Sequence, residues 1–247
     1  MQRQILIETL NELLHPELFK DYAPNGLQVE GKTEIARIVT AVTATRNVID
    51  RAIELQADVL LVHHGWFWRG ENPTITATKY RRLKALMSRD INLIAYHLPL
   101  DAHETLGNNA QMAKLLGACN IARGGQGDFI WTGEVQAISV KNLADQLKMS
   151  LQRAPLILGC EDKVLTKLAW CSGSAEDFFE DAIAMGAQAY ISGEATERTT
   201  HLARETGIPY LVCGHHATER LGIQALGQWL QRTQNLECIF VDDENPI

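Results

Sequence analysis

Histidines and carboxylates in three short motifs are the side chains whose types and spacing could do chemistry. They are His63, His64, His97, Asp101, His215 and Glu219, with Glu194 and His216 as outliers. Imidazole nitrogens together with carboxylate oxygens are ligands of Zn²⁺, Mn²⁺ or Fe²⁺, rather than of Ca²⁺ or of a structural zinc held by cysteines. One catalytic zinc needs only three protein ligands. The set therefore predicts two divalent ions, about 3.5–4 Å apart, bridged by a carboxylate and a water.

A pair of ions of this kind favours metal-assisted hydrolysis. Two divalent cations facing two carboxylates leave a net positive charge, which lowers the pKa of bound water towards about 7 and attracts phosphate or another anion. Each histidine taken alone could equally be an ordinary packed or solvated side chain. Cys213, two residues before His215, could also be a ligand, but its apolar neighbours favour burial.

The motifs follow short apolar runs that predict buried strands, over residues 59–62, 91–96 and 208–213. In open α/β sheets, ligands bind at the carboxyl ends of the strands. Neighbouring residues of a strand point to opposite faces, so His63 and His64 can serve one centre only if the strand ends there. Gly65 makes such an ending plausible, because it lets the backbone turn. The shared position at strand ends favours a metal site over unrelated histidines.

Hydrophobic periodicity predicts an alternation of strands and helices along the chain. In the first half the predicted helices cover residues 2–14, 46–55, 78–87 and 108–116, and the strands cover 27–30, 35–42, 59–62 and 91–96. In the second half the helices cover 143–149, 175–185 and 217–231, and the strands cover 134–140, 155–158, 168–171, 187–194, 208–213 and 238–241. This pattern predicts an α/β fold with mainly parallel sheets.

The second half repeats the first. Shifted by 130 positions, residues 43–64 overlay residues 173–194, which places His64 on Glu194. A shift of 118 places His97 and Asp101 on His215 and Glu219. We therefore predict an internal duplication. The glycine cluster at 124–127 predicts a boundary between a first domain, 1–125, and a second domain, 126–247, with the segment from about residue 215 returning to the first.

Composition limits the other possibilities. The net charge of −7 argues against a broad nucleic-acid-binding face, although the basic segment 79–89 and the aromatic loop 66–68 need an explanation. The basic segment is most simply a solvated helix face. The loop either plugs an edge of the core or forms a wall for a flat substrate ring. Five dispersed cysteines indicate reduced thiols. The absence of a long apolar run and of a signal peptide predicts a cytoplasmic protein with no membrane partner.

Longer segments around the motifs resemble a known family. Val62–Gly65, Tyr96–Asp101 and Cys213–Glu219 resemble the three motifs of the dinuclear-metal family called Ngg-interacting-factor-three-like, also known as GTP cyclohydrolase type 2-like. Pro24–Gly31 is similar to the amino-terminal signature of that family. The likeness spans the chain and is greatest with the short bacterial members, which lack an insert between the halves. His216 departs from the pattern, because the family commonly has tyrosine there.

The resemblance implies two similar three-layer α/β halves, interleaved around a dinuclear metal cleft, in a ring-shaped homohexamer or toroid. It implies two divalent ions (Zn, Fe or Mn) per subunit, with the ligands His63, His64, Asp101, His215 and Glu219. His97 matches a further motif histidine, which is expected beside the ions as a proton relay or an alternate ligand.

Our leading hypothesis from these observations is a dinuclear metal-dependent hydrolase. A metal-bound hydroxide would attack a nucleotide-like or other anionic substrate, with Glu219 or Asp101 bridging the ions and His97 relaying protons. The sequence indicates no catalytic residue beyond these. The alternative is a metal-stabilised ring that binds DNA or protein partners through the aromatic loop and the basic segment, with little catalysis. Metal storage is a third possibility.

Overall fold

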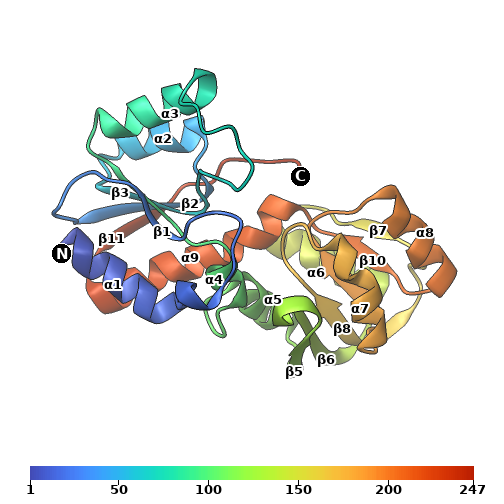
Figure 1. Ribbon diagram of the computed structural model, residues 1–247. Coiled ribbons are helices and arrows are strands. Elements are labelled where there is room, and N and C mark those ends of the chain that lie inside the picture. The colour runs from blue at the N-terminus through green and yellow to red at the C-terminus, as the bar shows by residue number, and fades with distance from the viewer. The chain divides into compact units, whose positions relative to one another are not determined.

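Two β-sheets, each with helices on both faces, organise the chain in the computed structural model, which describes residues 1–247 (Figure 1). Its contacts divide it into two compact units. The first unit comprises residues 1–107 and 222–244, and the second comprises residues 108–221 and 245–247. The predicted α/β class is confirmed.

The first unit is built on a five-stranded sheet of order β1-β4-β3-β2-β11. The bounds of the strands are Gly26–Val29 (β1), Asn92–Ala95 (β4), Val59–His64 (β3), Arg37–Thr43 (β2) and Glu237–Phe240 (β11). Four strands run parallel, and only β1 pairs in the antiparallel sense. Its helices are α1 (Arg3–Leu14), α2 (Arg46–Glu54), α3 (Ala77–Met87), α4 (Leu98–Ala102) and the larger part of α9 (His215–Gln234), with a 3₁₀ turn at Pro16–Leu18.

Alternation along the strands produces the three layers of this unit, because successive side chains point to opposite faces. Leu61 packs in the cluster that includes residues of α1 and α9, whereas its neighbours Leu60 and Val62 pack with residues of α2 and α3. Figure 1 shows these two pairs of helices on opposite sides of the sheet. Helix α1 ends at His15, which has a left-handed conformation (φ 49°), because the residue before a proline is disfavoured in the helical region.

The second unit is built on a six-stranded sheet of order β5-β6-β8-β9-β10-β7. The strands are Cys119–Gly124 (β5), Ile130–Ser139 (β6), Val164–Trp170 (β8), Ala189–Ser192 (β9), Tyr210–Val212 (β10) and Leu156–Leu158 (β7). The central strands β8, β9 and β10 are parallel, and the outer pairings are antiparallel. Its helices are α5 (Asn108–Leu116), α6 (Val140–Leu151), α7 (Phe179–Ala184), α8 (Glu197–Thr206) and the first turns of α9, with 3₁₀ turns at Gln126–Asp128 and Glu176–Phe178.

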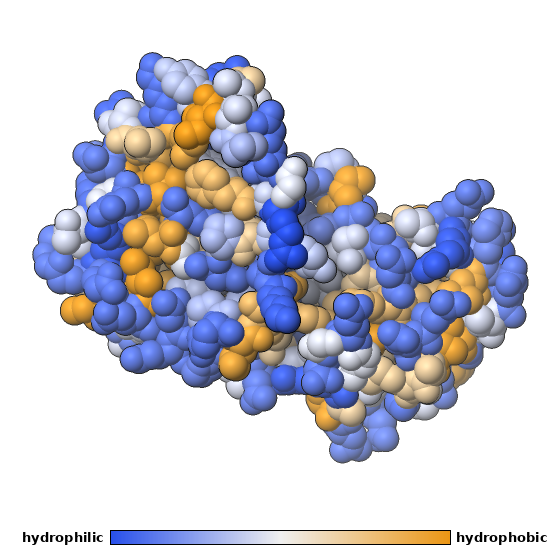
Figure 2. Space-filling model, viewed as in Figure 1, coloured by the Kyte–Doolittle hydropathy of each residue, from blue (hydrophilic) through white to orange (hydrophobic).

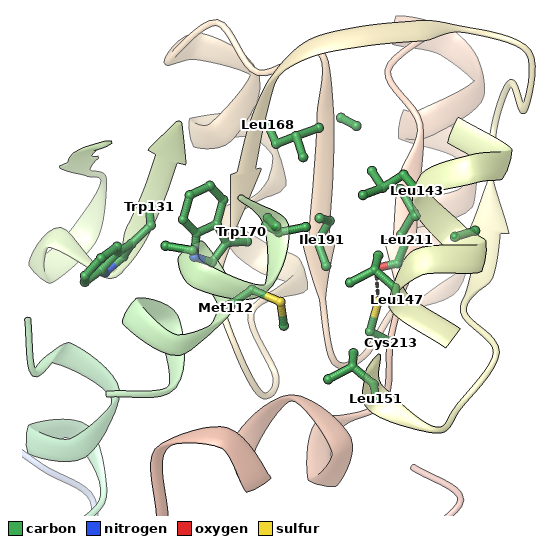
Figure 3. Packing of buried hydrophobic residues seen from close by; sticks show 14 of the residues in the cluster. Met112, Trp131, Leu143, Leu147, Leu151, Leu168, Trp170, Ile191, Leu211 and Cys213 are labelled. Atoms are coloured by element: carbon green, nitrogen blue, oxygen red, sulfur yellow. Dashed lines mark hydrogen bonds between the residues drawn. The ribbon is translucent and has the colours of Figure 1, made fainter. Parts of the chain in front are cut away.

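Alternation gives the second sheet two buried faces as well. Figure 3 shows Leu143 and Leu147 of α6 with Ile191 and Leu211 of the strands in one buried cluster. The opposite face of the sheet contributes Tyr190, among other residues, to the cluster formed with α7 and α8. A space-filling view shows hydrophilic residues over most of the visible surface (Figure 2).

The two units repeat local contacts in the register of the 130-residue shift. Asp58 accepts hydrogen bonds from the backbone N–H groups of Ala36 (2.9 Å) and Arg37 (3.0 Å). The corresponding Gln188 accepts from Thr166 (2.7 Å) and Lys167 (3.2 Å). These agreements support the predicted duplication, which itself stays a prediction.

A second repeated contact lies at the end of a helix in each unit. The side chain of Arg37 donates to the carbonyl of Leu55 after α2, at 2.7 Å, and the side chain of Lys167 donates to the carbonyl of Met185 after α7, also at 2.7 Å. Cations suit this position, because the last carbonyls of a helix lack intrahelical partners.

Some element boundaries differ from the sequence prediction. Strand β6 begins at Ile130 rather than at residue 134, β5 was not predicted, and α9 begins at His215 rather than at residue 217. The glycine cluster that predicted a boundary lies between β5 and β6, inside the second unit, where Gly125 and Gly127 have positive φ. The predicted division into two domains stays a prediction. No helix has the length and the apolar composition needed to cross a membrane.

Candidate functional site

His63 is fixed at the carboxyl end of β3 by a backbone contact. Its side chain is fully buried, and Nδ1 lies 3.0 Å from the carbonyl oxygen of Tyr96. A carbonyl only accepts hydrogen bonds, so Nδ1 carries the proton and donates. Such a bond sets the tautomer in which Nε2 is the nitrogen that can ligate a metal.

His64 is the last residue of β3, as the use of both histidines at one centre requires. Its Nδ1 lies 3.2 Å from the hydroxyl of Thr43, the residue paired with it on β2. The rings of His63 and His64 are 4.6 Å apart. The strand ends before Gly65, as predicted, and Gly65 has no positive φ. A Cβ at residue 65 would lie 2.2 Å from Oε1 of Gln28 and 2.7 Å from Cβ of Ala95, so this position has room only for glycine.

His97, which precedes α4, faces a buried carboxylate. Its Nδ1 lies 2.7 Å from Oδ1 of Asp21, whose side chain is 3 % exposed. Burial acts to raise the pKa of Asp21, but hydrogen bonds and the charge interaction, first of all with His97, outweigh burial and lower this pKa to about 2. Asp21 is therefore ionised at neutral pH and can only accept, so His97 donates from Nδ1.

Asp101 completes the polar group of the first unit. It is buried in α4, and its Oδ2 lies 3.5 Å from Nε2 of His63. His63, His64 and His97 each offer a nitrogen within 4.8 Å of the others, which is close enough for a shared ion. The first unit thus brings together four of the side chains singled out from the sequence.

In the second unit, His215 lies between two carboxylates. Its Nδ1 is 2.5 Å from Oε1 of Glu194, and its Nε2 is 3.1 Å from Oε1 of Glu219, which is one helical turn further along α9. Burial acts to lower the pKa of His215, but its interactions with Glu219 and then Glu194 outweigh burial and raise this pKa to about 9. Glu194, an outlier in the sequence, is therefore the hydrogen-bond partner of the predicted ligand His215.

Glycines shape the space around Glu219. Gly173 has φ +70°, and a Cβ there would lie 2.4 Å from Oε1 of Glu219 and 3.4 Å from Nε2 of His215. A Cβ on Gly193 would lie 2.6 Å from the Cα of His215. Thr218, which is fully buried, accepts from the backbone N–H of Gly173 at 3.0 Å. A side chain at position 173 would therefore displace the Glu219 carboxylate.

In each unit a histidine nitrogen and a carboxylate oxygen lie close enough together to bind one metal ion. Two ligands about 2.0–2.2 Å from one tetrahedral ion lie roughly 3.3–3.6 Å from each other. The Nε2–carboxylate pairs His63–Asp101 (3.5 Å) and His215–Glu219 (3.1 Å) have nearly this separation. Cys213 is fully buried in an apolar cluster, where burial raises the pKa of its thiol to about 12, so the expectation of burial rather than ligation holds.

The sequence analysis named Glu194, but it did not identify the residues that orient the three histidines of the first unit. Asp21 orients His97, Thr43 contacts His64, and the carbonyl of Tyr96 orients His63. Asp21 was the one that the sequence could have indicated, because it lies three residues before the Pro24–Gly26 turn. His216 is buried, and its backbone N–H donates to the carbonyl of Ile247 at 3.2 Å.

Comparisons with known proteins match the chain over its full length. The model of the family Duf34/NIF3 (NGG1p interacting factor 3) matches residues 1–246. A protein of Vibrio cholerae serotype O1 named GTP cyclohydrolase 1 type 2 homolog is 49% identical and covers 96% of each chain. A protein of the same name from Neisseria meningitidis serogroup A is 48% identical, over 99% of this chain and 98% of the relative. A solved structure described as protein ybgI, of unknown function, has a TM-score of 0.95 and 45% identity over 100% of both chains.

Proposed function

Because this chain belongs to the Duf34/NIF3 family, we propose that it is a metal-dependent hydrolase acting on a nucleotide-like or other anionic substrate. One observation carries the proposal. In both units a histidine uses Nδ1 to bond a fixed protein oxygen, and its Nε2 faces a buried carboxylate. Histidines at metal sites have this arrangement, in which the outer hydrogen bond orients the ring and raises its basicity.

We assign the ligands of the ions to the residues identified from the sequence. They are His63, His64 and Asp101 of the first unit and His215 and Glu219 of the second. Two divalent ions suit this number of donors, and Zn²⁺, Fe²⁺ and Mn²⁺ all accept nitrogen and carboxylate oxygen. When bound, such ions act as Lewis acids and lower the pKa of water.

His97 acts as a general acid and base at its Nε2 atom. A histidine in this role must be oriented and must be able to carry a proton near neutral pH. Asp21 fulfils the first requirement, because its ionised carboxylate accepts a hydrogen bond from Nδ1 at 2.7 Å. His97 therefore passes protons between substrate and solvent, whereas Asp21 positions it.

The names of the relatives guide the choice of substrate. Both relatives are named as homologues of GTP cyclohydrolase 1 type 2, so nucleotides are the first compounds to assay. We further propose that the chain forms the ring-shaped homohexamer that its family resemblance implies. Mass photometry of the metal-loaded protein tests this assembly, and a monodisperse monomer would exclude it.

The decisive experiment combines elemental analysis with a nucleotide turnover screen. The wild-type protein, His64→Ala and the control His201→Ala are loaded with Zn²⁺, Fe²⁺ or Mn²⁺ and dialysed. His201 is a suitable control because its side chain is 60% exposed, on α8. We expect His64→Ala to lose metal and turnover, and His201→Ala to retain both. Unchanged metal in His64→Ala removes this residue from the site, and the absence of turnover in every wild-type preparation overturns hydrolysis of nucleotides.

A second function, binding of DNA or an acidic partner, is favoured by the surface of α3. This helix carries four cations and no acidic residue, and Tyr80 and Met87 on it are 49% and 60% exposed. Aromatic and cationic side chains together suit single-stranded nucleic acid. Binding of labelled single-stranded DNA that is lost in Arg81→Ala and Lys84→Ala, while metal content is unchanged, would establish this function. Equal DNA binding by these variants and the wild type would exclude it.

A further inference from the structure

An aromatic and cationic rim borders the histidines of the first unit. It consists of Tyr22, Trp68 and Arg69, from the loop before β1 and the loop after β3. Tyr22 is 58% exposed, Arg69 is exposed, and Trp68 is partly buried. None of these three residues is a proposed metal ligand, so metal binding does not explain their position beside the histidines.

Trp68 is positioned by the histidines themselves. Its ring centroid lies 5.1 Å from that of His97, at an interplanar angle of 85°, and 5.8 Å from that of His64, at 62°. Edge-to-face contacts of this kind are favourable and hold the indole in place. The neighbouring Trp66 anchors the loop, since it is 7% exposed and its indole N–H donates to the carbonyl of Ala44 at 3.1 Å. Trp68 is thus a rigid flat surface beside two of the imidazoles.

Arg69, the residue after Trp68, places a positive charge beside Tyr22. Its backbone N–H donates to the carbonyl of Tyr22 at 2.7 Å, and its guanidinium donates to the carbonyl of Asp21 at 2.8 Å. The guanidinium carbon lies 6.0 Å from the ring centroid of Tyr22. Arg69 therefore has backbone carbonyls rather than a carboxylate as partners, and its charge is not cancelled by an ion pair. A guanidinium fork of this kind suits phosphate.

Phe67 provides the contrast. It is 37% exposed, but Lys79 lies over its ring, 5.8 Å from the centroid, and Lys79 also pairs with Glu71 at 3.2 Å. Phe67 and Glu71 of this loop therefore both contact Lys79. Phe67 and Lys79 are therefore structural, although they are next to the rim in sequence.

We propose that the rim of Tyr22, Trp68 and Arg69 binds a nucleoside phosphate, with the planar base against Trp68 and the phosphate on Arg69. This inference rests on the proposed function, because it names the substrate class of the same site. Stacking on one aromatic side chain changes Kd by roughly 5- to 150-fold. The base and the phosphate thus contribute separately, through different residues.

Isothermal titration calorimetry of the metal-loaded protein tests this separation with three probes: GMP, guanosine and inorganic pyrophosphate. We expect Trp68→Leu to weaken GMP and guanosine by roughly 5- to 150-fold and to leave pyrophosphate unchanged. Arg69→Gln is expected to weaken GMP and pyrophosphate and to leave guanosine unchanged. Trp68→Phe, which keeps a ring, should restore most of the GMP affinity, and Phe67→Leu should match the wild type.

The outcomes separate this inference from the proposed function. Equal GMP affinity in the wild type and Trp68→Leu, or an equal loss of GMP and pyrophosphate in Trp68→Leu, overturns the rim. If either of these outcomes is found but the wild type still turns over a base-free phosphate ester, the proposed hydrolase function is retained and only the rim is excluded. Base-dependent binding without turnover of any nucleotide or phosphate ester supports the rim and overturns the hydrolase.

Discussion

The same spacing, a histidine followed four residues later by an acid, is used differently in the two units. In the second unit, His215 pairs with its own acid, since Nε2 lies 3.1 Å from Glu219. In the first unit, Asp101 of α4 lies beside Nε2 of His63, which belongs to strand β3. The ring of His97 instead contacts the carboxylate of Asp21. Both acids are buried beside an imidazole, but the imidazole comes from a different place in the chain.

The difference shows that a pattern of residue types predicts which kinds of side chain lie close together. It is less able to predict which histidine pairs with which acid. His215 begins a helix of 20 residues, so Glu219 lies on the same face one turn later. His97 only precedes the short helix α4, which leaves its ring directed by the loop that contains Asp21. The second unit therefore has a carboxylate on both sides of one histidine, and the first has a group of three imidazoles.

Removal of the paired acids should have the largest effect. Asp101→Asn and Glu219→Gln each replace a buried anionic ligand by a neutral amide, so we expect metal affinity to fall by more than the roughly 10- to 100-fold typical of partners that only orient ligands. Competition with a fluorescent chelator measures this change. Glu197→Gln is the control, because Glu197 also lies beside a histidine, His201 at 3.9 Å, but on the surface. Equal metal affinity in all three variants would falsify the assignment of both acids.

Substitution of the acids that orient the histidines should have different effects in the two units. Glu194→Gln should lower metal affinity roughly 10- to 100-fold, because Glu194 orients the proposed ligand His215. Asp21→Asn should leave metal affinity unchanged and lower kcat, because Asp21 orients the proposed proton carrier His97. Chelator competition and steady-state kinetics provide the two measurements. Loss of metal in Asp21→Asn would instead make His97 a ligand.

Gly173→Ala should destabilise the second unit and displace Glu219. The added Cβ would lie 2.4 Å from the carboxylate, in a residue with φ +70°. Gly117→Ala is the matched control, since it has φ +64° and no atom within 4 Å of the added Cβ. We expect about 1 kcal/mol of destabilisation in the control and about 2–4 kcal/mol in Gly173→Ala, with metal loss only in the latter. Urea denaturation and elemental analysis measure both, and equal values would show that the contact with Glu219 is not restrictive.

The smallest effect concerns Asp58 and its counterpart Gln188. Burial acts to raise the pKa of Asp58, but Lys32, at 2.7 Å, and two backbone N–H groups lower it below its ordinary value of 3.8. A lowered folded-state pKa stabilises the protein above the unfolded pKa, and this stabilisation is lost as the pH falls through the folded-state value. Asp58→Asn should therefore cost about 1 kcal/mol at pH 7, less at pH 3.

Gln188→Ala provides the uncharged comparison for that experiment. Gln188 makes the corresponding backbone contacts without an ionisable group, so its loss should cost a similar free energy at both pH values. Urea denaturation at pH 7 and pH 3 measures both variants. A pH dependence that is equal in the two would contradict the role of the Asp58 charge.

Much of the fold was determined by local sequence. The apolar run 59–62 and the helical stripe of Ile5, Leu6, Leu10, Leu13 and Leu14 each predict an element that the structure contains. Of the stripe, Leu6, Leu10 and Leu14 are buried, whereas Ile5 is 50% exposed. The shift of 130 residues aligns Asp58 with Gln188, and the structure shows that these two side chains make corresponding backbone contacts. The exposed strand β5 was not predicted, because five of its six residues are exposed and no alternation marks it.

The sequence also determined which side chains lie at the strand ends, because the turn after a buried strand brings polar residues there. Only the tertiary structure decided which residues orient them. Asp21 and His97 are 76 positions apart, and Glu194 and His215 are 21 positions apart. A hydrogen bond between such residues depends on the packing of loops onto strand ends, which no local pattern of hydrophobicity specifies. Likewise, the pairing of Asp101 with His63 rather than with His97 follows from the direction in which each ring is held.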